Sequence, residues 1–141
     1  MKNLKANEYV PYQMNYIKLV SEQNIVKGLI DQKLEMIHFF SSIPVFKQEY
    51  RYQEGKWTIK DLLLHLIDAE RVFVYRALRI VRNDSTPLPG FDENSYAANG
   101  DASHRNWKDM LIEWRTVRQA TNLLFASFTP DQLKTKGNCN G

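Results

Sequence analysis

The chain has 141 residues, of which 43% are hydrophobic and 12% aromatic, a content that excludes a disordered chain and suits a single domain over residues 1–141. Its 19 basic and 16 acidic residues leave a net charge of +3 and are dispersed, so we expect no nucleic-acid partner, although the isoelectric point of about 9.0 keeps that alternative open. A single cysteine excludes an internal disulfide, and the polar N-terminus does not resemble a signal peptide. No apolar stretch approaches the ~20 residues that span a bilayer. We therefore expect a cytoplasmic protein without a membrane partner.

The first segment, from Tyr9 to Val20, is too short and too interrupted for a main helix. It contains Pro11 and the aromatic residues Tyr12 and Tyr16. Proline inside a helical pattern ends or kinks the helix, because it has no backbone N–H to donate. We therefore expect a short helical turn that lies as an N-terminal strap against the body of the domain.

A first long helix is predicted over residues 22–42. Ser21 can cap its N-terminus, and Pro44 follows its end. His38 lies at the edge of the apolar stripe of this helix, where we favour a partly exposed imidazole over a ligand role. The stripe follows the three-and-four spacing of one helix face and consists of Ile25, Val26, Leu29, Ile30, Leu34, Ile37 and Phe40.

The strongest helix prediction covers residues 58–82, around which the rest of the chain is expected to pack. Thr58 can cap the first free amides, and Asp61, three residues later, can complete a capping box. No glycine or proline interrupts the stretch from Lys56 to Thr86, and three arginines near its end suit the negative pole of the helix dipole. The middle of the helix is apolar nearly all round, which is typical of a central helix.

His65 is the imidazole in the middle of this helix. A neutral imidazole among apolar side chains is costly unless it is hydrogen-bonded or bound to a metal, and the spacing alone leaves both alternatives open. Asp68, one turn later, is the best candidate to orient the ring or to contact a bound water, and Asp61 is another nearby acid. We nevertheless favour an ion pair with an arginine for Asp68 and a capping role for Asp61.

Residues 83–102 contain two prolines and two glycines and are predicted to form a long loop. In a helical bundle, a connection of this length is typical of a crossover between parallel helices, so the expected helix order is up-down-down-up. A third long helix is predicted over residues 104–127, with Ser103 as a candidate for its cap. His104 falls at its first turn, where we favour a solvated side chain, because a protonated imidazole would meet the positive pole of the dipole.

Arg118 falls within the apolar stripe of the third predicted helix. An unpaired guanidinium would be expensive to bury there. We therefore expect Arg118 to pair with Asp68 or Glu70 of the central helix.

Four short motifs carry a resemblance to a known family, and they are Gly55 to Asp61 (GKWTIKD), His65 to Arg71 (HLIDAER), Tyr75–Arg76, and Leu88 to Asp92 (LPGFD). From about Tyr9 to its last residue, the chain resembles the DinB-like superfamily of four-helix bundles, many of which are metal-dependent enzymes. The resemblance implies that His65 matches a metal-ligating histidine on the second helix. In the family, two further ligands come from a His-x3-His pair on a fourth helix, and this sequence stops before such a helix.

Three long amphipathic helices without a fourth would leave an apolar groove of several hundred Å² open to water, which monomeric proteins rarely tolerate. We therefore expect either that the domain is incomplete at its C-terminus or that a partner fills the groove. A homodimer is the assembly that we expect.

The resemblance implies a divalent metal as the cofactor, Zn²⁺ or alternatively Ni, Mn or Fe. The implied function is that of a metal-dependent hydrolase or a thiol or other group transferase, acting on a small molecule. The alternative is a non-catalytic, dimerising helical bundle that acts as a scaffold or stress-related protein. Because His38 and His104 are poor substitutes for the two missing ligands, we do not expect this chain alone to hold a metal tightly.

Overall fold

The structure of the protein is a computed structural model that describes residue 5, residues 8–20 and residues 24–139. This part of the chain is helical, as the composition and periodicity predict, and it forms no β-strand beyond an isolated bridge between Leu88 and Cys139. Short 3-10 turns lie at Pro11–Gln13, Val45–Lys47, Ala102–His104 and Gln132–Lys134. The α-helices are α1 (Met14–Ile17), α2 (Ile25–Ser41), α3 (Ile59–Val81), α4 (Glu93–Asn99) and α5 (Trp107–Ala126).

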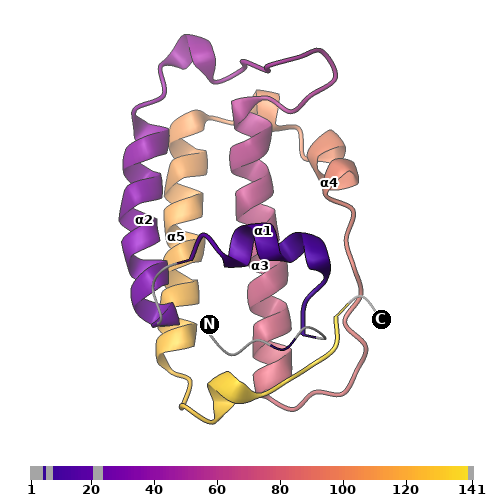
Figure 1. The fold of residues 1–141 in the computed structure, drawn as a ribbon. Helices are drawn as coiled ribbons and strands as arrows, with labels where there is room; N and C mark the ends of the chain where they lie inside the picture. The colour runs from indigo at the N-terminus through magenta and orange to yellow at the C-terminus, as the bar shows by residue number, and fades with distance from the viewer. Residues whose placement is uncertain (1–4, 6–7, 21–23, 140–141) are drawn as a thin grey trace.

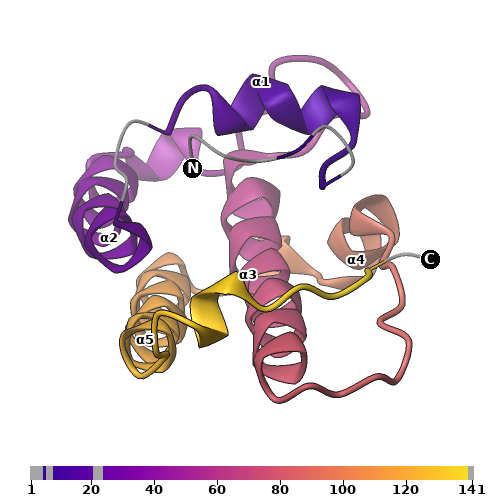
Figure 2. The ribbon, with the colours of Figure 1, turned by 60° about the horizontal axis from the view of Figure 1, so that its bottom comes forward.

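The helices α2, α3 and α5 lie side by side (Figure 1). α5 packs against both α2 and α3. α2 runs opposite to α3, whereas α3 and α5 run in the same direction (Figure 1). Figure 2 shows these three helices at the corners of a triangle, with α1 crossing the side between α2 and α3. Within the described residues, no helix combines the length and the apolar composition needed to cross a membrane.

The start of α3 confirms the predicted capping box. The Asp61 amide donates to Thr58 Oγ1 at 3.0 Å, and the Thr58 amide donates to Asp61 Oδ2 at 2.8 Å. Two of the amides that the first turn leaves without intrahelical partners are thereby satisfied. The helix predicted over residues 58–82 is observed at Ile59–Val81.

The two other predicted N-terminal caps differ from those observed. Ser21 lies outside the described residues, and α2 starts later than predicted, with Asn24 accepting from the Lys27 amide. Ser103 as a cap was wrong, because Asn106 caps α5 and accepts from the amides of residues 108 and 109. Asp101, in a left-handed conformation with φ of 51°, turns the chain into a 3-10 turn that contains Ser103 and is separate from α5.

The long loop predicted over residues 83–102 contains a helix. Asp92 accepts from two amides of the first turn of α4, which packs against α3. The contact is close at Gly100, where an added Cβ would lie 2.5 Å from Leu64 Cδ2. A larger residue at this position would force the buried Leu64 side chain to shift, so glycine favours the close approach of α4 to the central helix.

The core lies between α2, α3 and α5. Its fully buried large side chains are Phe40, Leu63, Ile67, Met110 and Trp114. Two apolar side chains of α3, Leu62 and Phe73, are nevertheless 42% and 56% exposed.

A buried ion pair joins α3 to α5 and confirms the predicted pairing of Arg118, with Glu70 as the partner. Arg118 Nε donates to Glu70 Oε1 and Oε2 at 2.7 and 2.8 Å, and Nη2 lies 2.6 Å from Oε2. Arg118 Nη1 also donates to Gln32 of α2 at 2.7 Å, and Thr121 Oγ1 donates to Glu70 at 2.6 Å. The guanidinium lies over the Trp114 ring, 5.2 Å from its centroid. Each charge is therefore compensated by several hydrogen bonds, which burial of an ion pair requires.

Replacing Arg118 with methionine should lower the free energy of unfolding by about 3–5 kcal/mol, because it leaves the Glu70 carboxylate buried without its partner. Urea denaturation followed by circular dichroism measures this change. Arg115→Met is the matched control, since Arg115 lies exposed on the same helix and should shift stability by less than about 0.5 kcal/mol. Equal stability of the two variants would mean that the buried pair contributes nothing.

Candidate functional site

His65 lies half-buried on α3, one turn after Asp61. Its ring contacts the indole of Trp57, with the ring centroids 4.8 Å apart and the planes inclined by 45°. Trp57 directly precedes the cap residue Thr58. The backbone amides of the first two residues of α3 donate to the carbonyls of residues 50 and 48, and these bonds hold the start of the helix in place. The capping box thus fixes the chain before the helix so that the indole covers the imidazole.

Asp68 also lies half-buried on α3, one turn beyond His65. Burial raises the pKa of its carboxyl group above the ordinary value, and the nearby Arg71 guanidinium opposes that rise. Arg71 Nη1 is 3.7 Å from Asp68 Oδ1. The predicted ion pair with an arginine is therefore present, although the Asp68 side chain is only partly buried.

Glu113 of α5 connects this face of α3 to its neighbour. It accepts from Arg71 at 2.6 Å and also pairs with Arg105. Burial alone would raise the pKa of Glu113, but the two guanidinium groups outweigh it and hold the pKa below its ordinary value. Asp68 and Glu113 are thus both engaged by arginines.

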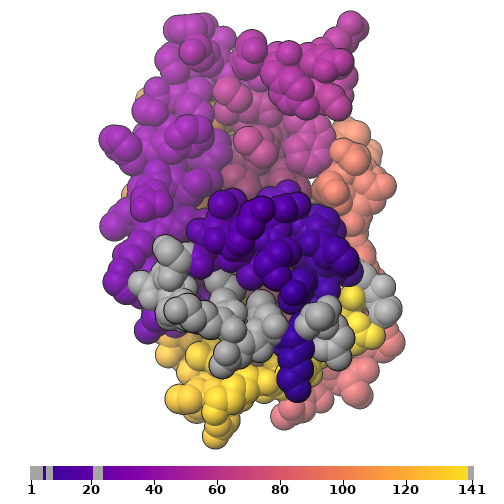
Figure 3. All heavy atoms as spheres, viewed as in Figure 1, coloured from indigo at the N-terminus to yellow at the C-terminus, as the bar shows by residue number. Residues whose placement is uncertain are grey.

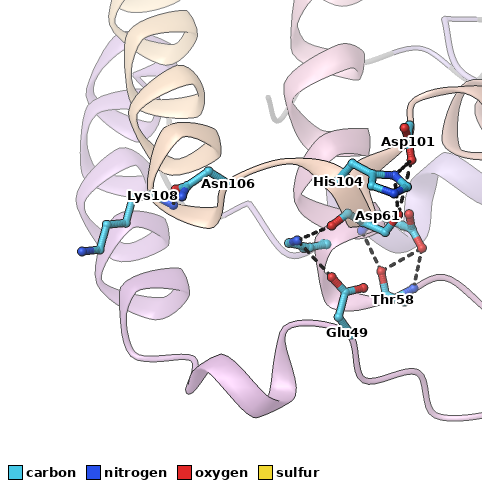
Figure 4. A network of polar contacts seen from close by, with 9 residues as sticks. Glu49, Thr58, Asp61, Asp101, His104, Asn106 and Lys108 are labelled. Atoms are coloured by element: carbon cyan, nitrogen blue, oxygen red, sulfur yellow. Dashed lines mark hydrogen bonds and ion pairs between the residues drawn. The ribbon is translucent and has the colours of Figure 1, made fainter.

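His104 and Asp101 form an exposed ion pair at the end of the molecule where α3 begins (Figure 4). His104 Nδ1 lies 2.6 Å from Asp101 Oδ1, and this hydrogen bond raises the pKa of His104 and lowers that of Asp101. Close by, Lys60 Nζ donates to the Ser103 carbonyl at 2.8 Å and lies 3.0 Å from Glu49 (Figure 4). The prediction of a solvated His104 is confirmed.

His38 is exposed on α2, as predicted, and belongs to a different element from His65 and His104. No group of three or more His, Cys, Asp or Glu side chains within the described ranges is arranged to hold a metal ion. Asp61 accepts from both the amide and the hydroxyl of Thr58. The carboxylates near His65 that could bind a metal are therefore engaged in capping and ion pairing. The side chains described here do not by themselves fit a metal centre.

Two features of this site were not predicted from the sequence. One is the contact between Trp57 and His65, and the other is the bridge from Arg71 through Glu113 to Arg105. An aromatic residue directly before a capping box is a signal that could have indicated the first feature. The second depends on the packing of α3 against α5, to which no local pattern points.

Replacing Asp101 with asparagine should lower the pKa of His104, because the neutral amide no longer favours the imidazolium. The wild-type pair is fully charged between the lowered pKa of Asp101 and the raised pKa of His104. Any stability that it contributes is present below the unfolded-state pKa of histidine and is lost as pH rises through the folded-state pKa. Titration of the His104 ring protons by NMR measures the shift, and the His38 signals should not respond to the substitution. An unchanged His104 titration would contradict the ion pair.

Comparisons with known proteins place the fold. The sequence profile described as the DinB superfamily matches residues 33–140. A search of curated proteins gave no match to the sequence. Among solved structures, the chain is similar to YfiT from Bacillus subtilis, with a TM-score of 0.65 and 19% identity over 91% of this chain and 72% of that one. YfiT is described as a probable metal-dependent hydrolase with an unusual four-helix bundle topology. Because the profile spans most of the described helices, including the whole of α3 and α5, the chain belongs to the DinB superfamily.

Proposed function

We propose that this chain is part of a metal-dependent enzyme in which His65 supplies one metal ligand. The enzyme would be a hydrolase, or alternatively a transferase of a thiol or another group. The proposal is supported by membership of the DinB superfamily and by the description of YfiT as a probable metal-dependent hydrolase. The observation that carries it is the setting of His65, half-buried on the central helix against Trp57. The metal would be Zn²⁺ or alternatively Ni, Mn or Fe, and the substrate a small molecule.

The surroundings of His65 suit a ligand better than a core residue. The half-buried imidazole is partly exposed to solvent, while the Trp57 contact restricts the orientations of the ring. Asp68 stands one turn away, with its pKa raised by burial. Catalytic zinc usually takes three protein ligands, and the described side chains offer His65 without two partners beside it. We therefore assign no catalytic step to a metal in this chain.

We also propose the up-down-down-up helix order for the complete bundle. Its support is the direction of α2, α3 and α5 in Figure 1, which run up, down and down. A fourth helix antiparallel to α5 would complete that order. The description of YfiT as a four-helix bundle of unusual topology is consistent with it.

The alternative function is a non-catalytic, dimerising bundle. Ile30 and Leu34, one turn apart on α2, are 45% and 65% exposed, so this part of the predicted apolar stripe is open to solvent. Such a stripe suits pairing with a second copy of the chain. An enzyme and a scaffold differ in their response to metal, which the first experiment below measures.

Calorimetric titration with Zn²⁺ tests His65 as a ligand. We expect the wild-type chain to bind weakly, without a stoichiometric sub-micromolar site, and His65→Ala to bind at least about tenfold more weakly still, a loss of about 1.4 kcal/mol. His38→Ala is the matched control and should bind like the wild type, because His38 is exposed on another helix. Equal binding by wild type and His65→Ala would remove His65 as a ligand. A sub-micromolar site lost in His65→Ala would show that the chain or its dimer holds a complete ligand set.

Sedimentation equilibrium tests the homodimer. We expect concentration-dependent association that Leu34→Glu weakens, because a carboxylate within the apolar stripe would have to be desolvated on pairing. Glu35→Gln, at the neighbouring exposed position, should leave the association unchanged. A monodisperse monomer at high micromolar concentration would contradict the dimer.

A further inference from the structure

The helix α4 and the residues just before it lie along the stretch of α3 that carries His65. At one end, Gly100 approaches Leu64 so closely that an added Cβ would lie 2.5 Å from the leucine side chain. At the other end, the ring centroids of Phe91 and Phe73 are 6.3 Å apart. Figure 2 shows α4 on the side of α3 away from α2, and Figure 3 shows α4 beside the upper part of α3, above α1.

The geometry of α3 indicates which of its faces this segment covers. Successive side chains of a helix are turned by about 100°, so Leu64 and Phe73 point to opposite sides of α3. Of the two faces between them, one belongs to the core and the other carries His65 and Arg76. Arg76 Nη2 donates to the carbonyl of Pro89 at 2.5 Å, which places the segment on the face that carries His65.

Three aromatic side chains of this region, Phe73, Phe91 and Tyr96, contact one another and are called the ring cluster here. Phe91 touches both other rings, with centroids 6.3 Å from Phe73 and 5.1 Å from Tyr96 and the planes inclined by 74° and 59°. Phe73 and Tyr96 are nevertheless 56% and 45% exposed. Aromatic side chains that gather on one surface and stay open to solvent are typical of a binding site rather than of a core.

The ring cluster is held in place from α3. The Arg76 side chain is buried, and its guanidinium lies 5.8 Å from the centroid of the Phe73 ring. The same guanidinium binds the carbonyl of Pro89, two positions before Phe91. Asp92 directly follows Phe91 and caps α4, so the backbone is fixed on both sides of this ring. A surface that is ordered in advance loses little conformational entropy when a ligand binds.

The chemistry of the ring cluster favours a neutral aromatic ring as its occupant. Rings that are inclined to one another offer both faces and edges, and aromatic pairs prefer the edge-to-face and offset arrangements that such surfaces allow. A cation is also attracted to ring faces, but the Arg76 guanidinium already lies over Phe73 and would repel it. An anion would meet the negative faces of the rings.

We propose that the ring cluster binds an aromatic ring of the substrate, beside His65. This inference rests on the proposed function, because it assigns the ring cluster and His65 to one site. Phe73 lies about 12 Å beyond His65 along the axis of α3, at a rise of about 1.5 Å per residue. The substrate is therefore a small molecule in which a short linker separates the reacting group from an aromatic ring.

Benzyl alcohol and cyclohexylmethanol form a matched pair of probes, because they differ in whether the ring is aromatic. Titrations of the full chain followed by NMR should give a dissociation constant for benzyl alcohol about three- to tenfold lower than that for cyclohexylmethanol. Intermolecular nuclear Overhauser effects should connect the ring of benzyl alcohol with Phe91 and Tyr96.

Substitutions of Tyr96 test the role of the ring. Tyr96→Leu keeps an apolar side chain without the ring and should weaken the binding of benzyl alcohol about three- to tenfold. Tyr96→Phe keeps the ring and should bind like the wild type. Tyr52→Leu is the matched control, because Tyr52 is 72% exposed in a segment outside the ring cluster. All three positions of change lie on the surface, so far-UV circular dichroism and the melting temperature should be retained.

Equal binding of the two probes would overturn the proposal, as would equal binding of benzyl alcohol by the wild type and Tyr96→Leu with both folded. A loss of self-association in Tyr96→Leu would also overturn it, because the rings would then belong to an interface between two copies.

The ring cluster and the metal ligand fail in separate experiments. Lack of preference for the aromatic probe overturns the ring cluster as a subsite even if His65→Ala loses Zn²⁺ binding. Equal Zn²⁺ binding by the wild type and His65→Ala overturns His65 as a ligand even if the aromatic probe is preferred.

Discussion

The ion pair between Glu70 and Arg118 is the constraint on which the rest of the bundle depends. It connects α3 to α5 through three short contacts and reaches α2 through Gln32. A carboxylate and a guanidinium buried together tolerate little relative displacement, because a lost hydrogen bond would leave a charge uncompensated at low dielectric. The pair therefore fixes the axial register of the helices, which apolar packing alone would leave less strictly defined.

The position of the ion pair distinguishes two faces of α3. Glu70 faces α5 and the cavity between α2, α3 and α5, whereas His65, Asp68 and Arg71 lie on the face that carries the candidate site. The charged groups of that face are also linked to α5, through Glu113, so the site is fixed from outside the core.

Local patterns were sufficient to predict the all-helical class, the bounds of α3 to within one residue and the Thr58–Asp61 capping box, because these depend on residues within one or two turns of one another. The Arg118 pair was predictable because a charged residue inside an apolar stripe needs a partner. The start of α5 was not predictable in this way, since Ser103 and Asn106 are both good caps. The left-handed turn at Asp101 places Ser103 in a separate 3-10 turn and leaves Asn106 as the cap. The helix α4 was not predicted because its seven residues are too few to show a periodic pattern. The Trp57–His65 contact was not predicted because it depends on the path of the chain just before α3.

The most direct test of this account is a double-mutant cycle on Glu70 and Arg118, with both residues replaced by methionine singly and together and the free energy of unfolding measured for all four proteins. If the buried pair sets the register, each single replacement leaves a buried charge unpaired, and the double replacement restores an apolar contact. The double variant should then be more stable than the sum of the single effects predicts by about 2–3 kcal/mol. Strictly additive effects would contradict the account, because they would show that the two charges do not stabilise each other in the folded protein.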